Sequence, residues 1–95
     1  MKISTVNIKD TGSVTVDMPI GARLQSAVLM NGTVQVNYSS AKDQPQEPVT
    51  LRVVSNFEEY PSNFIYLAML VDLDTRRVTH VVYDQPTPPV QINPL

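Results

Sequence analysis

FIYLAMLVDLDTRRVTHVVYD, residues Phe64 to Asp84, decides how this chain is expected to fold. Eight consecutive residues from Phe64 to Val71 are apolar or aromatic, and a polar turn, Asp72 to Arg76, separates them from a second strand, Arg77 to Tyr83. A strand exposes successive side chains on opposite faces, so an unbroken apolar strand needs cover on both faces. In a chain of 95 residues the second cover can be a sheet, a loop or another subunit. The hairpin therefore indicates a binding or assembly protein before an enzyme.

Alternating residues near the N-terminus predict a first hairpin. Lys2 to Ile8 alternates loosely, and Ser13 to Asp17 alternates cleanly between valines and polar residues. The segment between them, Lys9-Asp10-Thr11-Gly12, has Asp early and Gly last, as a type I turn prefers. The connector Met18 to Ala22 contains a proline and a glycine, so the second strand is expected to end there.

Asn31-Gly32 marks the clearest hairpin of the chain. A type I′ turn needs positive φ at both central residues, and Asn-Gly satisfies this best. The flanking segments, Arg23 to Met30 and Thr33 to Tyr38, both alternate. A short helix over Ala22 to Met30 is the alternative, since its residues have fair helical propensity, but the Asn-Gly turn and the alternation that follows favour strands.

Two polar loops flank a further strand. Ser39 to Pro48 is polar, contains two prolines and has almost nothing to bury, whereas Val49 to Val54 alternates with its valine and leucine side chains inward. The second loop, Ser55 to Asn63, carries Phe57 and Tyr60. Loop aromatics either pin the loop to the core or line a pocket, and pinning is the commoner role.

These segments predict an all-β protein. Eight prolines spread along the chain leave little room for a helix of more than a few turns. The expected architecture is a small sandwich or open barrel of about seven antiparallel strands. We expect a single β domain over residues 1–85 and a proline-rich, extended C-terminal tail over residues 86–95.

Composition excludes several classes of function. Seven Lys and Arg against nine Asp and Glu, net −2, argue against binding to long DNA or RNA. No cysteine and a single histidine leave no disulfide framework and no zinc site. No segment is long and apolar enough for a membrane span, and the N-terminus lacks the apolar core of a signal peptide. A cytoplasmic protein is expected.

Few residues offer catalytic or metal chemistry. His80 shares its strand face with Val78 and Val82, so a hydrogen-bonded structural histidine is favoured over a general base oriented by a nearby polar side chain. Asp72 and Asp74 can face the same side and hold a divalent cation, but such aspartates more often bond the backbone of a turn. No phosphate-binding glycine loop or nucleophile elbow is present. We expect no enzyme activity, no cofactor and no metal.

Arginines and aromatic residues are the candidates for ligand binding. Arginine forks onto phosphates and tyrosine stacks on bases, so a few such groups repeated by symmetry can build an anion pocket between subunits. Ordinary solvated charges and core aromatics are the alternative reading of each one. The predicted ligand-binding residues are Arg23, Arg52, Tyr60, Tyr66, Arg76, Arg77 and His80.

VDMPIGARLQSAVLMNGTVQV, Val16 to Val36, resembles a family of small phage and prophage proteins of unassigned function. Their pattern is a strand, "MP-x-GA", a second strand, "NG" and a third strand, followed by an Arg-led strand and a final "HV" strand. Leu51 to Val54 and His80 to Tyr83 match the last two, and the resemblance covers about Thr15 to Asp84. SNFEE replaces the glycine-rich turn that the family carries after the Arg-led strand, and the strand after Asn31-Gly32 is more polar than usual.

A phage origin implies a small accessory protein acting in the host cytoplasm. By type, the chain resembles phage sponges, which are β-rich oligomers that sequester nucleotide signals of bacterial immunity. The expected partners are therefore further copies of the chain, in a homo-oligomer, and a small anionic nucleotide. The alternatives are a virion or assembly component, or an inhibitor that binds a host protein through a strand edge.

Overall fold

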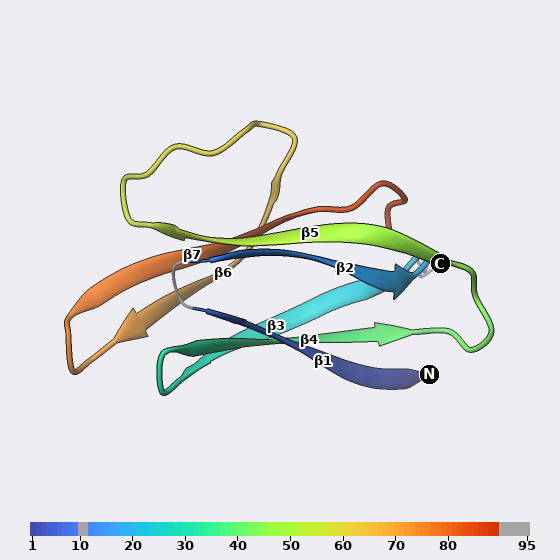
Figure 1. The fold of residues 1–95 in the computed structure, drawn as a ribbon, viewed down its shortest axis with the longest axis horizontal. Helices are drawn as coiled ribbons and strands as arrows, with labels where there is room; N and C mark the ends of the chain where they lie inside the picture. The colour runs from blue at the N-terminus through green and yellow to red at the C-terminus, as the bar shows by residue number, and fades with distance from the viewer. Residues whose placement is uncertain (10–11, 90–95) are drawn as a thin grey trace, which may run out of the picture.

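The computed structural model describes residues 1–9 and 12–89, and within them it contains seven strands and no helix. The strands are β1 (Lys2–Lys9), β2 (Ser13–Pro19), β3 (Arg23–Met30), β4 (Thr33–Ser40), β5 (Gln46–Ser55), β6 (Ile65–Asp72) and β7 (Arg77–Asp84). They form two antiparallel sheets, ordered β1-β4-β3 and β2-β5-β7-β6, which face each other in an open sandwich (Figure 1). The prediction of an all-β domain of about seven antiparallel strands is confirmed. Since the described residues are strands and turns, none of them forms a helix that could cross a bilayer.

The core lies between the two sheets. Val34 and Val36 of β4 face Val49 and Leu51 of β5 and Val81 of β7, and none of these side chains is exposed. Their spacing by two along each strand is what brings them to one face. The predicted inward face of the Val49 to Val54 strand is thus confirmed.

Tyr83 of β7 also faces this core and couples stability to pH. Burial disfavours the phenolate and raises the pKa of Tyr83 above the usual value of about 10. Between about pH 10 and the folded pKa, the unfolded chain loses this proton while the folded chain keeps it. The free energy of unfolding therefore falls as the pH rises above about 10. Urea titrations at about pH 9 and about pH 11 should show a smaller drop for Tyr83→Phe than for the wild type, whereas Tyr60→Phe at the surface should leave the drop unchanged.

Two of the three predicted hairpins are confirmed. In the β3–β4 hairpin Met30 pairs with Thr33, and the central residues Asn31 and Gly32 have φ of 51° and 78°. These angles are those of the type I′ turn that the Asn-Gly pair predicts. The β6–β7 hairpin closes with Asp72 paired to Arg77.

The predicted hairpin between β1 and β2 is wrong, although both strands form. β1 pairs with β4 and β2 pairs with β5, so the connection between β1 and β2 crosses from one sheet to the other. The Gly12 N–H donates to the Lys9 carbonyl at 2.9 Å, as in the predicted turn, whose central residues lie outside the described part of the chain. The crossing lets both strands turn their apolar faces to the same core instead of sharing one face of a hairpin.

The loop predicted over Ser39 to Pro48 is shorter than its composition suggests. β4 continues to Ser40, which pairs with Lys2, and β5 begins at Gln46, which pairs with Pro19. Polar residues join these strands because a neighbouring strand is there to pair with their backbone groups.

A register shift in β3 reverses which of its side chains face outward. The pairing with β4 shifts between Leu24 and Ser26, as in a β-bulge. Leu24 is buried, and after the shift Ala27 and Leu29 point to the core while Val28 and Met30 are exposed. A bulge adds one residue to one strand, so the alternation restarts on the other face.

The first residues after β7 are bonded to the body of the sandwich. Nε2 of Gln85 donates to the Ala22 carbonyl at 2.7 Å, and Thr87 donates through its N–H and hydroxyl to the Glu47 carboxylate at 3.1 and 2.8 Å. Residues 90–95 of the predicted tail lie outside the described part, so the boundary at residue 85 stays a prediction.

Candidate functional site

Three of the predicted ligand-binding residues share the outer face of the β2-β5-β7-β6 sheet. Arg52 of β5 pairs with Val82 of β7, and Val82 pairs with Tyr66 of β6. Arg52, Val82 and Tyr66 therefore form one row across the strands. His80 stands in the next row, opposite Val54 and Met69. We call Arg52, Tyr66 and His80, with the loop of residues 56–64 beside them, the outer-face site.

His80 is held by two neighbours on this face. Its Nε2 donates to Oδ1 of Asn56 at 3.1 Å, and its ring lies 5.8 Å from the Tyr66 ring, tilted by 49°. Its Nδ1 is shielded from solvent and has no hydrogen-bond partner among the described residues. Since one ring nitrogen is bonded and the other is covered, the geometry fits the structural histidine better than a general base.

A hydrogen-bond network fixes the loop to the sheet. Glu58 accepts from the Arg52 guanidinium at 2.8 Å and from the Ser55 N–H at 3.1 Å, while the Glu58 N–H donates to the Ser55 carbonyl at 3.0 Å. The Asn56 N–H donates to the Val78 carbonyl of β7 at 3.0 Å. Exposed ion pairs contribute only about 0–1 kcal/mol, so the loop is held by the set of bonds rather than by any one.

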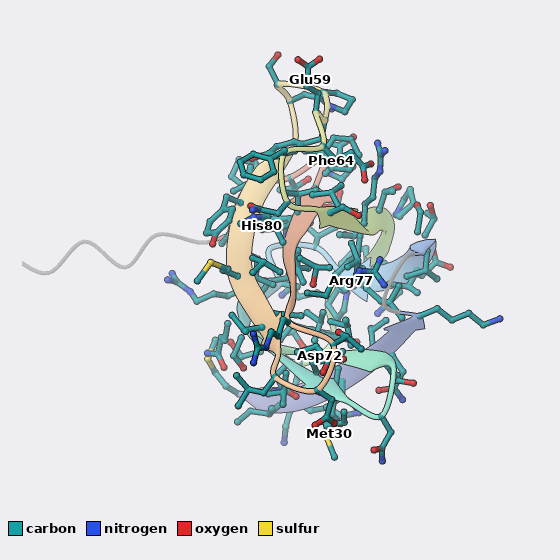
Figure 2. All side chains as sticks on the ribbon, turned by 90° about the vertical axis from the view of Figure 1, so that its left-hand side faces the viewer. Met30, Glu59, Phe64, Asp72, Arg77 and His80 are labelled. Carbon is teal, nitrogen blue, oxygen red and sulfur yellow. The ribbon has the colours of Figure 1, made fainter. Side chains whose placement is uncertain are left out.

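Phe57 lies at the centre of this network but contacts almost nothing. Its side chain is 96 % exposed and its backbone has φ of 71°. Tyr60 in the same loop is 36 % exposed. The expectation that loop aromatics pin the loop is therefore wrong for Phe57, because the polar bonds of its neighbours do the pinning. Figure 2 shows the loop rising from the sheet, with Glu59 far from the strands and His80 below it.

The remaining predicted residues lie elsewhere. Arg76 and Arg77 are at the β6–β7 turn, the end of that hairpin away from the loop, and Arg76 has φ of 57°. Arg23 begins β3 and lines a hollow of about 280 Å³ with Ile20 and Ala41. Within one chain, the fold does not gather the four arginines into a single anion site.

Asp72 and Asp74 take part in the hydrogen bonds of the β6–β7 turn. Oδ1 of Asp72 accepts from the Asp74 N–H at 3.0 Å and from the Thr75 N–H at 3.3 Å. In the described part of the chain, no group of three or more His, Asp or Glu side chains could hold a metal ion. The reading of Asp72 as a turn residue is confirmed.

Sequence reasoning missed Asn56, which carries no signal, since only the fold brings its amide to His80. Phe57 was singled out as a loop aromatic, but its exposure cannot be read from composition. Comparisons with protein-family models, with curated proteins and with solved structures found no match to this chain.

Proposed function

We propose that this chain is a non-enzymatic binding protein of phage origin that acts in the host cell by holding a protein partner at the outer-face site. The observation that carries the proposal is Phe57, a fully exposed aromatic on a left-handed backbone. Leaving such a side chain in water forgoes about 1.5–3 kcal/mol of burial, and positive φ costs a non-glycine residue about 1–2 kcal/mol. Glycine would hold the same turn without either cost. A partner that covers the ring explains why phenylalanine is there.

The chemistry around Phe57 describes the partner. Glu58 and Glu59 follow it directly, and Tyr66 of β6 packs its ring 5.8 Å from that of His80 on the same face. An aromatic anchor that enters an apolar pocket, with charges at its rim, is the usual centre of a protein interface. The matching surface is an apolar pocket with a basic border, on a host protein or on a component of the virion.

Phe57→Ala is expected to weaken binding of that partner by about 2 kcal/mol or more, which is roughly thirtyfold in Kd. The free energy of unfolding should change by less than about 0.5 kcal/mol, because the ring is exposed. The partner is first captured from host lysate with the wild type and then titrated in purified form against each variant. Ile3→Ala, which removes an apolar side chain that is 70 % exposed on β1, is the matched control. Equal affinity for the wild type and Phe57→Ala would contradict the proposal.

A small anionic nucleotide is the second candidate ligand. Arg52, Tyr66 and His80 face the same side of the sheet, and these are side chains that bind phosphate and stack on bases. It ranks second because Arg52 already bonds Glu58, so a phosphate would have to displace that carboxylate. Its function would then be that of a sponge for a nucleotide immune signal.

Thermal unfolding in the presence of cyclic di- and trinucleotides tests the second candidate. A ligand that binds only the folded chain raises the Tm by mass action. The rise should vanish in Arg52→Ala and persist in Arg23→Ala, whose side chain lies at a distant hollow. No rise with any nucleotide at saturation rejects the sponge.

A further inference from the structure

The outside of β6 is left without cover. The unbroken apolar strand predicts cover on both faces, and its inner side has it, with Leu70 buried in the core. On its outer side Tyr66, Met69 and Val71 are each about half exposed. Of the three possible covers, neither the facing sheet nor the loop of residues 56–64 encloses these side chains, which leaves another subunit.

The exposed side chains of β6 continue onto β3. The two strands contact each other where the edges of the two sheets meet (Figure 1). The register shift in β3 turns Val28 and Met30 outward on this side, and Leu73 in the adjoining turn is 84 % exposed. Figure 2 looks onto this end and shows Met30 next to Asp72. We call Val28, Met30, Tyr66, Met69, Val71 and Leu73 the seam strip.

The seam strip lacks the features that keep other strand edges apart. Soluble proteins protect such edges with charged residues or proline. The edge strand β2 carries Asp17 and Pro19 within its span, whereas β3 and β6 carry a charge only at one end, at Arg23 and Asp72. From Ile65 to Val71 there is neither a charge nor a proline.

The area of the strip is enough for a small interface between two copies. Complete burial of an apolar side chain removes roughly 60–120 Å² from water, and the six side chains are 44–84 % exposed. The strip therefore offers roughly 200–400 Å² of apolar surface per copy, or roughly 400–800 Å² for two copies. Since about 60 % of an interface is apolar, the whole interface would bury roughly 700–1,300 Å², and the upper part of this range reaches the lower end for specific complexes.

A groove gives the strip a shape that a second copy can fill. It has a volume of about 540 Å³ and lies between the β3–β4 and β6–β7 turns, where Met30, Val71 and Leu73 line it together with the polar residues Asn31, Asp72 and Asp74. Leu73 is 84 % exposed, so the strip has both a protruding side chain and a hollow. A twofold axis places Leu73 of each copy in the groove of the other copy, as in an isologous interface.

We propose that the seam strip is the interface of a homodimer whose twofold axis passes near Val71, so that each copy covers β6 and β3 of the other. The interface does not include Phe57, and of the outer-face site it shares only Tyr66, which lies 5.8 Å from the His80 ring. It names the surface on which the expected homo-oligomer is built.

Sedimentation equilibrium over a range of concentrations tests the interface. The wild type should show twice the mass of one chain, and Val71→Glu and Met69→Glu should each raise the dissociation constant at least tenfold. Both positions are about half exposed in one chain, so the variants should stay folded, which circular dichroism checks. Ile3→Glu places the same charge on an exposed apolar position of β1 and should leave the dimer intact. A wild type that is monomeric at every concentration, or a dimer that Val71→Glu leaves unchanged, would overturn the proposal.

Cysteine cross-linking tests the position of the axis independently of affinity. The chain has no cysteine, so a single introduced thiol can pair only with its copy. A disulfide needs Cα atoms about 4.4–6.8 Å apart. Val71→Cys should oxidise to a covalent dimer in dilute solution and Ile3→Cys should not. Equal cross-linking of both variants, or of Ile3→Cys alone, would overturn the assigned axis.

Discussion

Val82→Asp is expected to lower the free energy of unfolding by more than about 4 kcal/mol. Val82 is fully buried although it points to the outer face of its sheet, beside the loop of residues 56–64. A carboxylate there loses its water, and the guanidinium of its cross-strand neighbour Arg52 is already bonded to Glu58. Small domains have only about 5–15 kcal/mol to lose, so the variant should be largely unfolded under mild denaturing conditions. Urea titration followed by circular dichroism measures the loss.

Val71→Asp is the matched control for this prediction. Val71 lies on the same outer face but is 47 % exposed. In dilute solution, where dimerisation does not contribute, its substitution should cost about 1 kcal/mol or less, the spread of strand propensities. Similar losses in the two variants would mean that the loop does not shield Val82, and that the outer-face site is open to water down to the strands.

Leu51→Ala should lower the free energy of unfolding by about 2–5 kcal/mol. Leu51 is among the largest fully buried side chains and lies in the centre of β5, the strand that pairs with both β2 and β7. Its truncation loses apolar burial and leaves a cavity that neighbours on two sheets cannot fill without giving up their own packing. Equilibrium urea unfolding of the purified variant gives the value.

Ile3→Ala supplies the reference for that loss. Ile3 is 70 % exposed, so its truncation should change stability by about 0.5 kcal/mol or less. If Leu51→Ala were equally mild, the two sheets would not be packed against each other at their centre.

Local features of the fold could be predicted from the sequence. The hairpin at Asn31-Gly32 follows from backbone angles that few residue pairs adopt, and the β6–β7 hairpin follows from two apolar strands around a polar turn. Strand identity also follows from alternation, which needs only residues two apart. Each of these signals lies within a few residues of the structure it predicts.

Pairing between distant strands could not be predicted in this way. The turn after Lys9 is compatible both with a hairpin and with a crossing between sheets, and only the burial of both apolar faces decides between them. The shift after Leu24 likewise depends on the partner strand β4, so the outward direction of Val28 and Met30 had no local sign.

The candidate site was predicted residue by residue but not as an assembly. Arg52, Tyr66 and His80 come from three strands and meet because of the register of β5 and β6 on β7. The chemistry of Arg23 and Arg76 is the same as that of Arg52, yet the fold sets them at other ends of the molecule. Phe57 is exposed because its neighbours Asn56 and Glu58 bond the loop to the sheet. The sequence around Phe57 gives no sign of these bonds.

The pairing of β1 with β4 and of β2 with β5, instead of with each other, also affects the speed and order of folding. β1 and β2 leave the ribosome first, but their partners β4 and β5 are made much later. The β3–β4 and β6–β7 hairpins can form as soon as both of their strands are made. β1 and β2 form contacts only after a long loop has closed, and closing that loop costs conformational entropy. Topologies dominated by such pairings fold in about milliseconds to seconds. We expect nascent chains to leave the apolar side chains of β1 uncovered until residue 40 has emerged and those of β2 uncovered until residue 55 has emerged, so these two strands are made well before they can pair.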